Sequence, residues 1–120
     1  AFVESISSLL QEAGYQVEAT GRINDVSGET REVDLLCSSN HRRVLIDIRR
    51  EGVAVGAVPV VFLLLKINDL KCSEAVLIAV PRADTLARTL SRARHIMLVE
   101  VESPLESTDF LKERMLHDSS

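Results

Sequence analysis

Three short apolar runs, at residues 44–49, 75–80 and 96–101, alternate with two segments of helical length. This alternation restricts the fold more than any other feature of the sequence. Such runs are typical of interior strands that are covered on both faces. Strands separated by helices join as parallel neighbours through right-handed crossovers. The second half of the chain is therefore expected to form a parallel sheet with intervening helices.

The helices of this half have recognisable starts. Pro59 suits the first turn of a helix because its missing N–H costs little there, so we expect a mostly apolar helix over residues 60–70 that is buried on most sides. Asp84 or Thr85 can cap the next helix. That helix is expected to turn four apolar side chains inward: Leu86, Ala87, Leu90 and Ala93.

The first half begins with a helix over residues 2–13, since apolar residues recur there at helical spacing and Gly14 follows. Two short strands on either side of a polar turn predict an antiparallel hairpin. The remaining expected elements are a strand at 15–20, a loop at 21–30, hairpin strands at 32–37 and 44–49, and a terminal helix at 107–116. The predicted order is α-β-β-β-α-β-α-β-α, an α/β fold with a mixed sheet.

Length and composition indicate one globular domain over residues 1–120, and the missing initiator Met leaves open that the chain is a fragment of a longer protein. The longest uncharged apolar run, residues 53–65, is too short to span a bilayer and predicts either core or the seam of a homodimer. Cys37 and Cys72 lie apart from any metal or disulfide pattern, which favours a reduced, cytoplasmic protein.

Charge gives a local signal only. A formal net charge of -4 excludes a global basic field, so an anionic partner must be held locally. Arginine is the residue suited to forked contacts with phosphate, although solvation and helix dipoles also explain surface arginines. The candidate nucleic-acid contacts are Arg42, Arg43, Arg50, Arg88 and Arg92.

A constellation that can carry chemistry lies in the hairpin. Asp47 sits between Ile46 and Ile48, where a carboxylate is costly unless a cation compensates it. Arg49 lies on the same face, two residues away, and Asp34 can lie beside both on the neighbouring strand. Two carboxylates with a backbone carbonyl suit Mg²⁺ or Mn²⁺, which activates water for attack on a phosphodiester. The alternative is a structural ion-pair cluster at a sheet edge.

These residues stand in a familiar setting. Leu9-Leu10 and Gly14-Tyr15, followed by Glu32-Val33-Asp34-Leu35-Leu36 and Leu45-Ile46-Asp47-Ile48-Arg49, resemble the PD-(D/E)XK nucleases over roughly residues 2–101. In particular, they resemble the Mrr-like restriction endonucleases and the archaeal Holliday-junction resolvases. The resemblance implies a restriction-endonuclease-like, three-layer α/β/α domain that cuts DNA, frequently as a homodimer. It also implies that Asp34 and Asp47 bind the metal.

Two departures from that family leave two functional interpretations open. Arg49 stands where the family has a catalytic lysine, and an arginine can stabilise charge but cannot act as a base. Val3 stands where many relatives carry a glutamate, with Glu4 next to it as an auxiliary candidate. We therefore expect a Mg²⁺-dependent DNA endonuclease, or an inactive nuclease-fold module that binds nucleic acid or protein. A flavodoxin-like ligand-binding domain is a weaker alternative, because no glycine-rich phosphate loop follows a strand.

Overall fold

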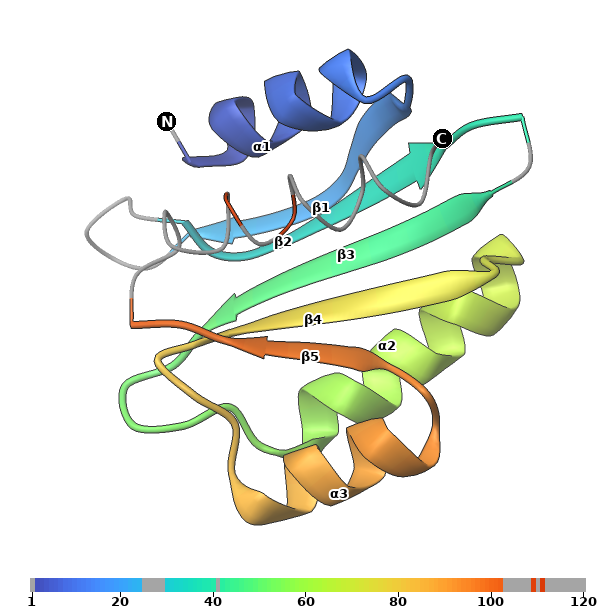
Figure 1. Ribbon diagram of the computed structural model, residues 1–120. Helices are drawn as coiled ribbons and strands as arrows, with labels where there is room; N and C mark the ends of the chain where they lie inside the picture. The colour runs from blue at the N-terminus through green and yellow to red at the C-terminus, as the bar shows by residue number, and fades with distance from the viewer. Residues whose placement is uncertain (1, 25–29, 41, 103–108, 110, 112–120) are drawn as a thin grey trace.

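The protein is a three-layer α/β/α domain (Figure 1). The structure, a computed structural model, describes residues 2–24, 30–40, 42–102, 109 and 111. One layer holds α1, the middle layer is the sheet, and the third layer holds α2 and α3. The elements in chain order are α1 (Phe2–Glu12), β1 (Gln16–Asn24), β2 (Thr30–Ser38), β3 (Arg43–Arg50), α2 (Ala57–Leu70), β4 (Glu74–Val80), α3 (Thr85–Ala93) and β5 (Met97–Glu100).

The sheet has the spatial order β1-β2-β3-β4-β5. Its first three strands are antiparallel neighbours, and β3, β4 and β5 run parallel. Both the predicted hairpin and the predicted parallel half are confirmed. The helix predicted at 107–116 lies outside the described residues except for positions 109 and 111. Within the described part of the chain, no helix has the length and apolarity needed to cross a membrane.

The side chains of β3 alternate between the two faces of the sheet. They therefore contribute to two separate cores and determine which face carries the candidate site. Val44, Ile46 and Ile48 belong to the core that includes the buried residues of α1. Leu45 belongs to the core that includes Val60 and Leu63 of α2. Because successive side chains of a strand point to opposite faces, Asp47 and Arg49 share the α2 face with Leu45.

The sequence-based prediction was wrong about where β1 ends. Residues 21–24 were expected in a loop, yet β1 continues to Asn24 and pairs with β2. The register shifts between Ala19 and Gly21, as at a β-bulge. Pairing with β2 thus overrides the turn preference of this segment, and the bulge absorbs the extra residue.

The residues that α2 and α3 bury differ from those that the sequence predicts. Helix α2 was predicted to be buried on most sides, but only Pro59, Val60 and Leu63 are buried along it. In α3, Asp84 is the N-cap as predicted, and its Oδ1 accepts a hydrogen bond of 2.8 Å from the Ala87 N–H. Leu86 and Ala93 were predicted inward and are exposed, because α3 turns Ala87 and Ser91, four residues apart, toward the sheet.

Candidate metal centre

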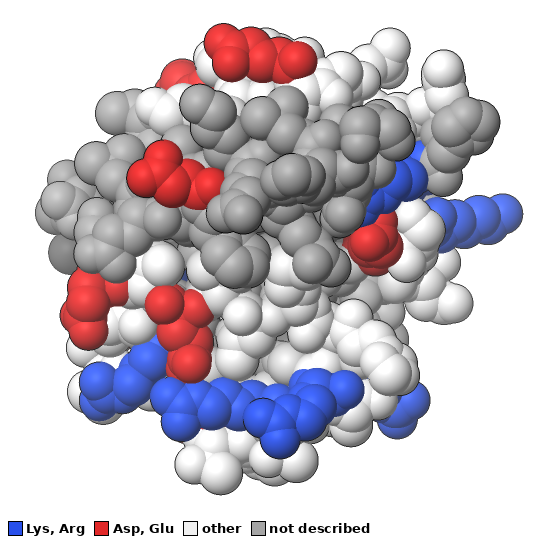
Figure 2. Space-filling model, viewed as in Figure 1, with Lys and Arg blue, Asp and Glu red and all other residues white. Residues whose placement is uncertain are grey.

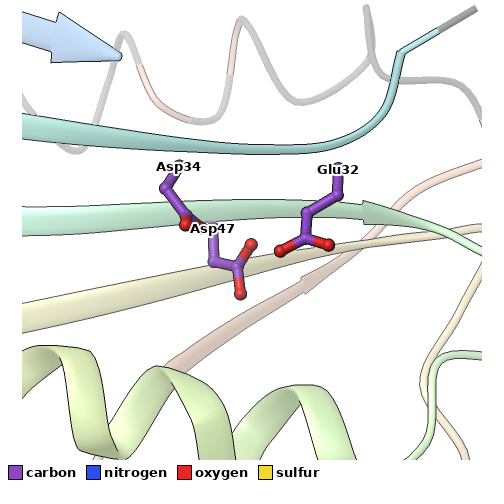
Figure 3. A group of neighbouring side chains, drawn as sticks. All are labelled: Glu32, Asp34 and Asp47. Atoms are coloured by element: carbon purple, nitrogen blue, oxygen red, sulfur yellow. The ribbon is translucent and has the colours of Figure 1, made fainter. Parts of the chain in front are cut away.

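Three carboxylates converge on the α2 side of the β2–β3 hairpin (Figure 3). Asp34 and Asp47 are direct partners across the two antiparallel strands, and Glu32 is the partner of Arg49. Glu32 and Asp34 are two residues apart and therefore share a face. Each of Glu32, Asp34 and Asp47 offers an oxygen within 4.8 Å of the others. The pairing register, set by the hairpin, creates the cluster.

Two cations hold these carboxylates together. Arg49 bridges two of them, with its Nη2 2.7 Å from Glu32 Oε1 and its Nε 3.3 Å from Asp47 Oδ1. Lys66 reaches down from α2, forms an ion pair with Asp34, and lies with its Nζ 3.8 Å from Glu32 Oε1. Three carboxylates therefore face two cations in a largely buried site. The arrangement leaves the cluster one negative charge in excess when every group is ionised.

Asp47 bears the electrostatic cost of this arrangement. Its side chain is fully buried, and it lies opposite another carboxylate. Burial raises the pKa of Asp47 to about 8, helped by its hydrogen bond with Asp34 and by the charge of Asp34; Arg49 and Lys66 oppose the rise. Asp47 is therefore mostly protonated at neutral pH until a further cation compensates its charge.

The residues present fit a divalent cation. Asp34 Oδ1 is buried and has no hydrogen-bond partner within the described part of the protein, so one ligand atom is available. Carboxylate oxygens are the hard donors that Mg²⁺ and Mn²⁺ prefer. Gly21 adds room, since a Cβ there would lie 3.2 Å from Asp34 Oδ2. A bulge with glycine beside a functional carboxylate is a recurrent way of keeping such space open.

The structure brings Asp34, Asp47 and Arg49 together, as the sequence suggested. It does not bring Glu4 to them. Glu4 is exposed on α1, in the layer on the other side of the sheet, and is outside the cluster of carboxylates within 4.8 Å. Glu4 was the auxiliary candidate of the sequence, and in the structure the sheet lies between α1 and the carboxylate cluster.

Sequence reasoning missed two members of the site. Glu32 carried a usable signal, because a residue two positions before Asp34 in a strand must share its face. Lys66 carried a weaker one, as the one charge in an otherwise uncharged stretch of helix from Ala57 to Ile67. Its pairing with Asp34 depends on how α2 packs across β2 and β3, which no local pattern reveals.

The predicted nucleic-acid contacts divide into two groups. Arg42 donates hydrogen bonds of 2.6 Å to Glu74 and 2.7 Å to the Tyr15 hydroxyl, and Arg88 pairs with Glu100 at 2.9 Å. Arg43 and Arg92 are exposed, and Arg50 is half-buried. Figure 2 shows positive side chains gathered along the edge of the molecule where α3 lies. The exposed arginines of α3 and its flanking residues are Arg82, Arg88, Arg92 and Arg94.

The chain is similar to known proteins in sequence and in fold. Residues 1–103 match the Mrr_cat family, described as restriction endonuclease. No curated protein matches the chain. The fold is similar to the crystal structure of a protein of unknown function, AF1548, with a TM-score of 0.60, 13% identity, and coverage of 96% of this chain and 78% of that one.

A second similar structure is that of EndoMS in its apo form. The TM-score is 0.54 and the identity 13%, with coverage of 87% of this chain and 47% of the EndoMS chain. At this identity both likenesses concern the fold, and they agree with the restriction-endonuclease-like order of elements. The match of the family over residues 1–103 covers the β2–β3 hairpin and its acidic cluster. The chain belongs to the Mrr_cat family of restriction endonucleases.

Proposed function

We propose that this domain is a Mg²⁺- or Mn²⁺-dependent nuclease that hydrolyses phosphodiester bonds in DNA. The observation that carries the proposal is the group of three carboxylates within 4.8 Å on the β2–β3 hairpin of a restriction endonuclease family fold. Glu32, Asp34 and Asp47 would hold the ion. A bound ion of this kind supplies an activated water and neutralises charge on the phosphate.

The two cations of the site have different chemistry and therefore different proposed roles. Arg49 cannot lose its proton, and its fork is fixed on Glu32 and Asp47. It would hold these carboxylates in place and stabilise negative charge that develops on the phosphate. A lysine ammonium, unlike a guanidinium, can give up a proton, and the ammonium of Lys66 forms an ion pair with Asp34. Lys66 would therefore supply the mobile proton that Arg49 cannot.

Substrate binding in this proposal depends on local positive charge. Arg43 and Arg92 are exposed and Arg50 is half-buried, and these three arginines are candidate phosphate contacts. Arg42 and Arg88 pair with the carboxylates of Glu74 and Glu100. Contacts to phosphate weaken with salt because counterions are released on binding. We expect DNA affinity to fall steeply between low and physiological salt.

A second function has its own supporting observation. Arg49 and Lys66 together pair with all three carboxylates, so the cluster can persist as a structural ion-pair network. In that case the domain would be an inactive nuclease-fold module that binds nucleic acid or protein. Breaking a buried network of this kind is strongly destabilising, which distinguishes this function from the first.

The test is cleavage of supercoiled circular DNA and of a branched DNA by wild type, Asp34→Asn and Glu12→Gln. Glu12 is an exposed carboxylate on α1 and serves as the matched control. The nuclease proposal predicts cleavage that requires Mg²⁺ or Mn²⁺, is lost in Asp34→Asn, and is retained in Glu12→Gln. DNA binding without cleavage on either substrate, with either ion, would favour the inactive module.

A further inference from the structure

Four side chains on the α2 face of the hairpin form two rows that cross from β2 to β3. Asp34 lies opposite Asp47 in the first row, and Glu32 lies opposite Arg49 in the second. The rows are about 7 Å apart, because they are two residues apart along each strand. The first row is a pair of carboxylates, whereas the second joins a carboxylate to a guanidinium. The two rows therefore offer a metal ion different surroundings.

The first row has free donors for an ion. Asp34 and Asp47 are both buried. The Lys66 ammonium pairs with Asp34 through Oδ2, and Asp34 Oδ1 has no hydrogen-bond partner among the described residues. Two carboxylates that face each other away from water need a cation, and a dication meets both charges at once. The first row is therefore the place for an ion in this cluster.

The second row is already filled by a fixed cation. Arg49 Nη2 lies 2.7 Å from Glu32 Oε1, and Arg49 Nε lies 3.3 Å from both carboxylate oxygens of Asp47. A guanidinium keeps its charge at any ordinary pH. Where proteins hold two ions about 3.5–4 Å apart, the ions share a carboxylate. Asp47 is the carboxylate between the two rows, and its side toward the second row is bound to Arg49.

Lys66 does not restrict the cluster in the same way. Its side chain is 33% exposed and extends from α2, whereas the side chain of Arg49 is 12% exposed and lies on the same strand as Asp47. An ammonium on a long, flexible stem can move aside for an ion more easily than a guanidinium held by two carboxylates. Arg49 is therefore the residue that limits how many ions the cluster accepts.

The total charge supports the same limit. With every group ionised, three carboxylates face Arg49 and Lys66 and leave one negative charge in excess. One dication changes this to a single positive charge, and a second dication would raise the excess to three positive charges. An excess of that size in a largely buried site is strongly unfavourable. The charge of the cluster is thus suited to one divalent ion.

We propose that the metal centre binds a single divalent ion at the row of Asp34 and Asp47, and that Arg49 takes the place of a second ion. Glu32 offers an oxygen within 4.8 Å of the other two carboxylates and can reach the same ion. The inference rests on the proposed function, which assigns an ion to this cluster. It adds the number of ions and the residue that sets this number. Arg49 would supply the second positive charge that a two-ion site offers a phosphate.

Titration of Mn²⁺ to about 1 mM, followed by calorimetry and electron paramagnetic resonance, counts the bound ions and shows whether two of them are adjacent. Wild type is expected to bind one ion with the spectrum of an isolated Mn²⁺. Arg49→Met removes one positive charge and frees Glu32 and one side of Asp47, so it is expected to bind two ions with the magnetically coupled spectrum of a close pair. The matched control is Arg92→Met, which removes an exposed arginine of α3 and should bind one ion.

The titration is repeated with thymidine monophosphate at about 1 mM, because a phosphate can supply oxygen ligands to a second ion. Wild type should still bind one ion. Circular dichroism checks the folding of each variant, and Arg49→Gln, which removes the charge and keeps a hydrogen-bond donor, carries the same prediction where Arg49→Met does not fold. A wild type that binds two ions, or a folded Arg49→Met or Arg49→Gln that binds one, would overturn this inference alone. A wild type that binds no ion would overturn the proposed metal centre as well.

Discussion

The substitution Asp47→Asn is expected to stabilise the metal-free protein while abolishing metal binding. Asp47 is fully buried opposite Asp34, and burial raises its pKa from 3.8 to about 8. The folded state therefore binds a proton that the unfolded state has lost, and the free energy of unfolding falls as pH rises from about 4 to about 8. At pH 7 the cost has a ceiling of about 4 kcal/mol, at about 1.4 kcal/mol per pKa unit.

Asparagine removes that cost and keeps the size of the side chain. We expect a gain of about 2 kcal/mol at pH 7, below the ceiling because Arg49 keeps a weaker partner. Urea unfolding with EDTA at pH 5, 7 and 9 measures it, with Glu12→Gln as the control for loss of an exposed carboxylate. Wild type should lose stability from pH 5 to 9 more steeply than Asp47→Asn. If Asp47→Asn is less stable than wild type at every pH, the carboxylate is a structural ion-pair partner and its burial carries no net cost.

Three further predictions concern the same cluster. The affinity for Mg²⁺ should rise by up to about tenfold per pH unit below pH 8, because Asp47 must release its proton to bind the ion. Calorimetry that finds equal affinity at pH 6 and pH 8.5 would contradict this prediction. Lys66→Met should reduce DNA cleavage at least about 100-fold and leave Mg²⁺ binding intact, since it removes the mobile proton and no ligand; unchanged cleavage would exclude Lys66 from catalysis. Gly21→Val should weaken Mg²⁺ binding and lower the free energy of unfolding by about 1–2 kcal/mol, because a Cβ at position 21 lies 3.2 Å from Asp34 Oδ2. Gly52→Ala is the control, since a Cβ at position 52 meets nothing within 4 Å, and it should change neither quantity. Equal effects of these two glycine substitutions would show that the space beside Asp34 is irrelevant.

The hairpin and its acidic pair could be predicted because they follow from local rules. Strand alternation puts Asp47 and Arg49 on one face, and a short polar turn makes the two strands antiparallel neighbours. The register that sets Asp34 opposite Asp47 then needs only the pattern of buried residues on the other face. The same alternation includes Glu32, which the sequence analysis passed over.

The remaining features depend on how distant elements pack. Glu4 is remote from the carboxylate cluster because α1 covers the other face of the sheet. Nothing in residues 2–13 indicates which face α1 will cover. Lys66 enters the site only because α2 crosses near Asp34. The apolar run at 53–65 allows core or seam, since hydrophobic residues alone do not say whether the same chain or a second copy covers them.

Calorimetric titration of Mg²⁺ and Mn²⁺ into wild type and Asp47→Asn tests whether the carboxylate cluster is a metal centre, because it requires no assumption about the substrate. We expect saturable binding of at least one ion to wild type, with release of protons near pH 7, and no binding to Asp47→Asn. Binding of equal strength to both proteins would contradict the assignment of Asp47 as a ligand. The absence of binding to wild type with either ion, in the presence and absence of DNA, would contradict the metal centre itself.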